Sequence, residues 1–191
     1  MSELISMRSG RSSKMELETI VKVCSSLKRG NAINLLEVGV YQGESSEIFL
    51  NTGLVSKLYC VDPWTCGYDD HDDASKTDMT AVERAFDNRV TNRYDNVVKH
   101  KGTIGTFVET KFDHIDVVYI DGSHRYEDVL NDIQTTIDHI RPSVAISGHD
   151  YFWSDGTKPC VQNAVNRLLG YPDMILGMAS WIKFRNTYAW S

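Results

Sequence analysis

The sequence lacks several features that would have fixed its class at once. No apolar run in its 191 residues approaches the roughly 20 residues of a membrane span, so no membrane partner is expected. The opening stretch MSELISMRSGRSSK has no apolar core of a secretory signal. Its four cysteines form no C-x-x-C pair, which argues against a zinc or redox motif and favours reduced thiols in the cytoplasm. A net charge of −6 without a Lys/Arg stripe argues against a nucleic-acid partner.

The chain does contain an alternation of helical and strand patterns, which is typical of an α/β domain with a mostly parallel sheet. The apolar share of 41% and the charged share of 24% are ordinary for a soluble globular protein. We expect a flexible N-terminal arm over residues 1–12 and a single domain over residues 13–191.

The expected elements alternate along the whole chain. Strands are predicted at INLLEV, KLYCVD, NVVKH, IDVVYID and SVAIS, with two antiparallel strands in the tail MILGMASWIKFRNTYAW. Helices are predicted at 14–29, 44–51, 79–93, 103–111, 124–140 and from Pro159 to before Gly170. Capping boxes are expected at Ser13 with Glu16 and at Thr80 with Glu83. The assembly is a Rossmann-like, mostly parallel sheet of about seven strands, with helices on both faces and an antiparallel C-terminal strand.

The first predicted strand runs into the glycine-containing stretch LLEVGVYQGESS. In open α/β sheets the ligand binds beyond the carboxyl ends of the strands, where the strand order reverses. Gly39 permits a tight turn, and Gly43 permits the close approach of a ligand or a helix. Ser45 begins a helix whose free N–H groups favour a carboxylate, whereas Glu37 favours a cation. A ligand that carries both an ammonium and a carboxylate fits this turn.

The second predicted strand ends in Asp62, 25 residues after Glu37. An acid at that position typically binds the two hydroxyls of a ribose. Each acid also has a plain structural reading, a helix cap for Glu37 and a turn residue before Pro63 for Asp62. Their occurrence at consecutive strand ends favours an amino acid joined to a nucleoside.

The chain resembles the class I methyltransferases that use S-adenosylmethionine (SAM), and their catechol O-methyltransferase-like branch, in the string Glu37-x-Gly39-x-Tyr41-x-Gly43-x-Ser45 and in Asp62. The resemblance spans residues 31 to 190 in strand order. It implies that the first motif surrounds the methionine part, that Asp62 binds the ribose, and that Gly102 and Thr103 lie near the adenine. Tyr41 also offers a π-face to the sulfonium. The SAM-binding residues are therefore expected to be Glu37, Gly39, Tyr41, Gly43, Ser45, Asp62, Gly102, Thr103 and Asp121.

A second group of polar residues follows the fourth and fifth predicted strands. Asp121 ends the fourth strand with His124 three residues on, and His149 and Asp150 follow the fifth. Neighbouring strands would bring all four beside the SAM methyl group. Taken singly, Asp121 is compatible with a helix cap, for which Ser123 competes, and the histidines with ordinary loop positions. Together they suit a hydroxyl acceptor, because carboxylates hold a cation that lowers the hydroxyl pKa and an imidazole takes the proton.

The resemblance extends to metal-dependent O-methyltransferases, including the catechol type and the macrocin type that act on antibiotic sugars. In these families an acid ends the fourth strand and a pair of oxygen ligands follows the fifth. The resemblance implies a metal on Asp121 and Asp150, with His149 as a further candidate ligand, and His124 as the base. His149 departs from the Asp or Glu of those families and shifts the preference from magnesium toward manganese, iron or zinc.

The polar stretch after Asp62, PWTCGYDDHDDASKTD, lacks the glycine and the glutamate of an EF-hand calcium loop. It lies at the rim of the predicted site, so residues 64–78 are expected to act as a lid. Trp64 and Trp153 also lie in rim loops, where each either walls a flat or sugar-like substrate or belongs to the core.

The sequence thus predicts a SAM-dependent methyltransferase that acts on a hydroxyl of a small molecule, such as a sugar, phenol or polyketide-like acceptor. The expected cofactors are SAM and a divalent cation, magnesium or manganese, and a homodimer agrees with similar families. A metal-independent methyltransferase would use His124 and His149 as an acid/base pair. A nicotinamide-dependent dehydrogenase and a non-catalytic SAM sensor remain alternatives, although the missing third glycine of G-x-G-x-x-G disfavours the dehydrogenase.

Overall fold

The computed structural model describes residues 11–69, 72–177 and 179–185. The predicted arm over residues 1–12 lies outside them except for its last two residues, which belong to a helix. Residues 70 and 71 of the predicted lid and residues 186–190 of the predicted tail strand also lie outside them. Among the described helices, none combines the length and the apolar character needed to cross a membrane.

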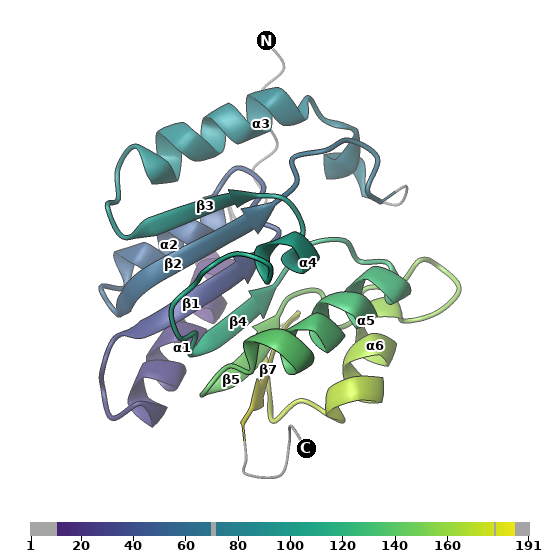
Figure 1. Cartoon of the computed structure of the whole chain (residues 1–191). Coiled ribbons are helices and arrows are strands. Elements are labelled where there is room, and N and C mark those ends of the chain that lie inside the picture. Colours follow the sequence, from purple (N-terminus) through teal and green to yellow (C-terminus); the bar gives the residue numbers. More distant parts are fainter. Residues whose placement is uncertain (1–10, 70–71, 178, 186–191) are drawn as a thin grey trace.

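Seven strands form one sheet in the order β3-β2-β1-β4-β5-β7-β6 (Figure 1). Their bounds are β1 (Ile33–Val38), β2 (Val55–Asp62), β3 (Val97–Lys101), β4 (Val117–Ile120), β5 (Ala145–Gly148), β6 (Met174–Leu176) and β7 (Ser180–Phe184). The first five strands pair in parallel, and β7 pairs antiparallel with both β5 and β6. This confirms the predicted fold class. The order reverses between β1 and β4, which is where such sheets bind ligands.

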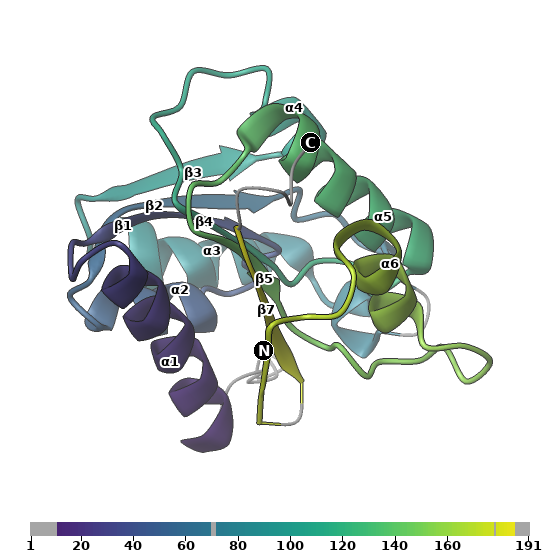
Figure 2. The same cartoon turned by 90° about the horizontal axis from the view of Figure 1, so that it is seen from below.

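Helices cover both faces of this sheet (Figure 2). One face carries α1 (Arg11–Leu27), α2 (Glu44–Asn51) and α3 (Met79–Phe86), and the other carries α4 (Ile104–Phe107), α5 (Tyr126–Thr135) and α6 (Cys160–Leu169). Two of them, α3 and α5, continue into π-helical turns at Asp87–Thr91 and Thr136–Ile140.

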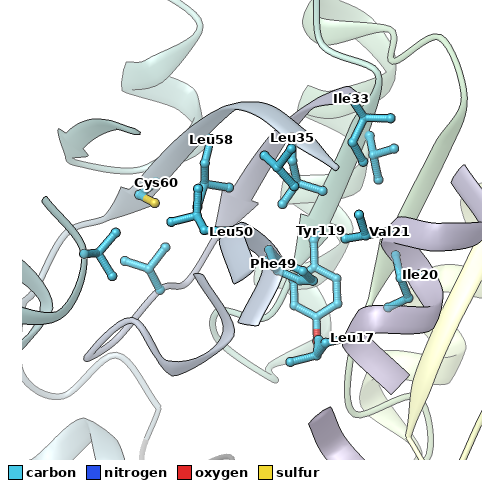
Figure 3. Close-up of a cluster of buried hydrophobic side chains, with 14 of the residues drawn as sticks. Leu17, Ile20, Val21, Ile33, Leu35, Phe49, Leu50, Leu58, Cys60 and Tyr119 are labelled. Carbon is cyan, nitrogen blue, oxygen red and sulfur yellow. The ribbon is translucent and has the colours of Figure 1, made fainter. Parts of the chain in front are cut away.

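The core has two halves because the sheet is buried on both sides. Leu35 and Leu36 are both fully buried but belong to different clusters, since consecutive side chains of a strand point to opposite faces. In the cluster of Figure 3, Leu17 of α1 and Phe49 of α2 lie near Tyr119 of β4. The rings of Phe49 and Tyr119 meet edge to face with centroids 5.1 Å apart. The strands therefore form a fixed platform for the residues at their ends.

Two predicted helix caps are wrong. The first helix begins at Arg11, so Ser13 lies inside it. Glu16 is buried instead and accepts a hydrogen bond from the Ser180 hydroxyl at 2.7 Å, which ties α1 to β7. The third helix is capped by Asp78, whose carboxylate accepts from two backbone N–H groups, and Thr80 supplies only one of these. Glu16 therefore bonds to a residue of a distant strand, and the residue before Met79, not Thr80, caps the third helix.

Candidate active site

Two adjoining cavities open at the carboxyl ends of the central strands. The larger measures about 470 Å³ and the smaller about 200 Å³. Cavities of a few hundred Å³ are the usual size for small-molecule sites. Five residues line both cavities, which makes them one continuous cleft: Gly39, Tyr41, Tyr68, Asp121 and Gly122. The cleft lies at the predicted reversal of strand order.

Glu37 lies beneath the first turn and lines neither cavity. It is fully buried, and its two carboxylate oxygens accept hydrogen bonds from the hydroxyls of Ser45 and Ser46. The predicted contact of Glu37 with a ligand ammonium stays a prediction. In this structure Glu37 fixes the start of α2, and Ser45 itself lines the smaller cavity.

The two glycines of the turn permit close packing of different parts. A Cβ on Gly39, whose φ is +84°, would lie 2.3 Å from the carbonyl oxygen of Asp121. A Cβ on Gly43 would lie 2.5 Å from Val90 and 2.9 Å from Phe86. Gly43 was predicted to allow the close approach of either a ligand or a helix, and in this structure it is the helical segment with Phe86 and Val90 that packs against it. Gly39 instead allows the turn after β1 to pack against the end of β4. Tyr41 also adopts a left-handed backbone, with φ of +49°.

Asp62 holds the same turn from the end of β2. Its Oδ2 atom accepts the backbone N–H groups of Val40 and Tyr41 at 3.1 and 2.9 Å. Its Oδ1 atom accepts the N–H of Trp64 at 2.7 Å. Burial raises the pKa of Asp62, and these three N–H groups act in the opposite direction. The carboxylate lines the larger cavity, where its remaining lone pair is available to a ligand hydroxyl.

The far end of the larger cavity is formed by α4 and α5. Gly102 and Thr103, predicted to lie near the adenine, both line it, and Thr103 caps α4 with its hydroxyl. The same wall contains Asp128 and Asp132 of α5, which the sequence reading missed. Burial and, less strongly, Asp128 raise the pKa of Asp132 to about 7. Asp128 and Asp132 are four residues apart on α5, so they lie on the same face of the helix. No local sequence motif shows that this face borders the cavity.

The second predicted group of residues comes together around Asp150. The Nε2 atom of His124 lies 3.0 Å from Oδ2 of Asp150, and Nδ1 of His149 lies 2.9 Å from the same oxygen. Asp121 lies 4.0 Å from His149 Nδ1. One potential ligand atom from each of Asp121, His124 and Asp150 falls within 4.8 Å of the other two. Among the described residues, this set of possible metal ligands includes His124, whereas the prediction had chosen His149.

Charge is tightly balanced in this group. Burial alone would raise the pKa of Asp150, but the hydrogen bonds from His124 and His149 hold it well below its usual value. Burial would lower the pKa of His124, but the contact with Asp150 and the nearby acids raises it above its usual value. Asp150 has φ of +53°, a left-handed conformation that is uncommon for residues other than glycine.

Three residues outside the predicted site set hold these side chains in place. Trp153, predicted only as a rim residue, stacks on the His124 ring with centroids 5.2 Å apart. Trp181 of β7 donates its ring N–H to the carbonyl of His149 at 3.2 Å. Asp69 accepts the backbone N–H of His124 at 3.2 Å. Each of the three is distant in sequence from the histidine that it contacts, which explains why a local motif did not reveal these contacts.

The polar segment between β2 and α3 forms part of both cavity walls. Thr65, Gly67 and Tyr68 line the larger cavity, and Tyr68 and Asp72 line the smaller one. Trp64 is buried, with its ring N–H donated to the carbonyl of Tyr41, so it belongs to the core and not to a substrate wall.

Comparison with known proteins supports the same reading. A family model described as a methyltransferase domain matches residues 36–151. The uncharacterized protein R132 of Acanthamoeba polyphaga mimivirus is 22% identical over 178 residues, which cover 92% of this chain and 75% of that protein.

Solved structures share the fold at low identity. An O-methyltransferase from Bacillus cereus, solved with SAH, has a TM-score of 0.65 and 16% identity, with 96% of this chain and 84% of that chain covered. The O-methyltransferase NovP has a TM-score of 0.66 and 16% identity, with 93% and 81% covered. Because the family model covers more than half of the sequence, the chain belongs to the methyltransferase domain family.

Proposed function

We propose that this enzyme transfers the methyl group of SAM to a hydroxyl of a small molecule. The observation that carries the proposal is the group of Asp121, His124 and Asp150 at the junction of the two cavities. A cofactor in the larger cavity and an acceptor in the smaller one would meet beside Asp121, which lines both. Family membership removes the dehydrogenase alternative.

The larger cavity supplies the groups that SAM requires. Asp62 presents a carboxylate for the ribose hydroxyls, and Gly102 and Thr103 lie on the wall assigned to the adenine. Gly39 and Tyr41 border the part that joins the smaller cavity and would receive the methionine end. Glu37 contributes indirectly, because it holds Ser45 and the first turn of α2 in position.

Methyl transfer to a hydroxyl needs a proton acceptor. The acceptor oxygen attacks the methyl carbon, the carbon–sulfur bond breaks, and its electron pair stays on sulfur, which leaves S-adenosylhomocysteine. The hydroxyl proton must leave, and the imidazole of His124, which lines the smaller cavity beside Asp150, is the group placed to receive it. Trp153 keeps the ring in its plane.

The carboxylates also fit a divalent cation. Asp121 and Asp150 offer oxygen donors, and either His124 or His149 offers a nitrogen donor in contact with Asp150. A mixed oxygen and nitrogen set suits manganese, iron or zinc better than magnesium. Such a cation would lower the pKa of the acceptor hydroxyl and orient it.

A metal-independent reaction is the second candidate, and one observation favours it. Both histidines already contact Asp150, so the acid/base pair is assembled by protein groups alone. Removal of divalent cations separates the two mechanisms. Activity that a chelator abolishes and manganese restores supports the cation, whereas activity that the chelator leaves unchanged supports the histidine pair.

The test of the proposal is transfer of a labelled methyl group from SAM to a panel of sugars, phenols and polyketide-like alcohols. Labelled products from a hydroxyl acceptor, lost in His124→Ala, would support it. Labelling of amines but not hydroxyls would overturn it, and SAM binding without transfer to any acceptor would favour a sensor.

A further inference from the structure

Asp132 of α5 places a carboxylate on the wall of the larger cavity and does not line the smaller one. Among the residues that the structure describes, none donates a hydrogen bond to this carboxylate or forms an ion pair with it. Burial, and less strongly Asp128, raise its pKa to about 7. A carboxylate in such surroundings needs a hydrogen-bond donor, and a ligand in the cavity is placed to supply one.

Two other acids that line the same cavity are already hydrogen-bonded. Asp62 accepts three backbone N–H groups, and Asp128 accepts the Ser123 hydroxyl at 2.7 Å. Each of these acids therefore has a donor from the protein itself. Asp132 differs from them, because its carboxylate depends on what occupies the cavity.

The carboxylate of Asp132 lies beside the backbone that follows β4. A Cβ on Gly122 would lie 3.9 Å from Oδ2 of Asp132, which is an ordinary contact distance. The helices α4 and α5 are neighbours, and Gly102 and Thr103, which precede α4, line the same cavity (Figure 1). Asp132, Gly102 and Thr103 therefore border a part of the larger cavity that the smaller one does not share.

The chemistry of SAM limits which donor can reach this part of the cavity. SAM carries three kinds of hydrogen-bond donor, namely the ammonium, the ribose hydroxyls and the amino group on C6 of adenine. In the proposed placement the methyl group and the ammonium lie toward the smaller cavity, beside Asp121, and the ribose hydroxyls lie at Asp62. The adenine amino group is the donor that is left for Asp132.

We propose that Asp132 is a specificity-determining residue whose carboxylate accepts a hydrogen bond from the amino group of adenine. The inference rests on the proposed placement of SAM in the larger cavity. A site built to bond an N–H group rejects an analogue that lacks it, because the polar group of the site is then left unpaired. Asp132 would thus select adenine over a base without an amino group at C6.

The test compares S-adenosylhomocysteine with its 6-deamino analogue, in which purine replaces adenine, by calorimetric titration. We expect the wild type to bind the purine analogue about 10- to 100-fold more weakly. Asp132→Leu should bind the two ligands within about twofold of each other, because the amino group has lost its acceptor. The matched control is Asp138→Leu, on the exposed turn after α5, which should keep the preference of the wild type.

Equal affinities of the wild type for the two ligands, or an unchanged preference in Asp132→Leu, would overturn the assignment. Asp132→Ala repeats the comparison if the leucine variant does not fold, and the wild-type comparison needs no variant at all. A wild type that prefers adenine but methylates no hydroxyl would refute the proposed function alone. A wild type that does not bind S-adenosylhomocysteine would overturn both proposals.

Discussion

The two halves of the cleft are built in different ways. At the ends of β1 and β2, Asp62 accepts three backbone N–H groups and Glu37 accepts two serine hydroxyls, and no donor lies more than 22 residues from its acceptor. At the ends of β4 and β5, the contacts are between ionisable side chains, and His124 is held by residues as distant as Asp69.

The difference separates binding from chemistry. Asp62 holds a turn whose shape is set by backbone hydrogen bonds, and a turn of fixed shape is suited to binding one particular ligand. Around Asp150, one carboxylate oxygen is shared by two imidazoles, so protons and cations can exchange there. We therefore expect substitutions in the first half to change SAM affinity and substitutions in the second half to change the rate of transfer.

The largest effect is expected at the second half. His124→Ala should lower kcat by roughly 10²- to 10⁴-fold, because the hydroxyl proton loses its acceptor. The Kd for SAM should change by less than about twofold. Steady-state kinetics with calorimetry measures both, and His139→Ala, an exposed histidine on the turn after α5, is the control. A weaker affinity for SAM with a normal kcat in His124→Ala would contradict the assignment of binding to the first half and chemistry to the second.

The contact between the halves can be broken at Gly39. Gly39→Ala places a methyl group against the backbone of Asp121 at a positive φ, so we expect a loss of about 3 kcal/mol in unfolding free energy. Gly53→Ala is the control, because its φ is also positive but nothing lies within 4 Å of the added carbon, and it should cost only about 1 kcal/mol. Urea denaturation compares the two, and equal losses would contradict the proposed close packing.

The first half is tested by Asp62→Asn. The amide nitrogen would face backbone N–H donors, and the ribose would lose a charged partner, so the Kd for SAM should rise by about 10- to 100-fold. The kcat at saturating SAM should remain near that of the wild type. A fall in kcat with unchanged affinity would reverse the assignment of the two halves.

The smallest effect concerns pH and Asp132. Because its folded pKa of about 7 lies above the usual 3.8, the unfolded chain releases this proton first, and stability falls as the pH rises from about 4 to 7. Asp132→Asn should remove on the order of 1–2 kcal/mol of that fall. Unfolding measured against pH checks this, and an unchanged profile in the variant would exclude Asp132 as the cause.

Much of the first half was predictable because its contacts are local. The strand, the glycine turn and the acid at the end of β2 appear in order along the chain, and the structure places Gly39, Tyr41 and Asp62 on the cleft wall. Burial of Glu37 was not predictable, because Ser45 and Ser46 compete with any ligand for its oxygens and a sequence motif does not show that competition.

The second half was predictable only in outline. Parallel strands bring Asp121 and Asp150 together whatever lies between them. The pairing of Asp150 with both histidines depends on side-chain orientation and on its left-handed backbone. The contacts from Asp69 and Trp181 depend on how a loop and the last strand pack, and no periodic pattern records that packing.

The most direct test of the separation is a calorimetric titration of the wild type, Asp62→Asn and His124→Ala with S-adenosylhomocysteine and with NAD. The account predicts that S-adenosylhomocysteine binds the wild type and His124→Ala with the same affinity, binds Asp62→Asn at least about 10-fold more weakly, and that NAD binds none of them. Loss of affinity in His124→Ala, or full affinity in Asp62→Asn, would contradict it.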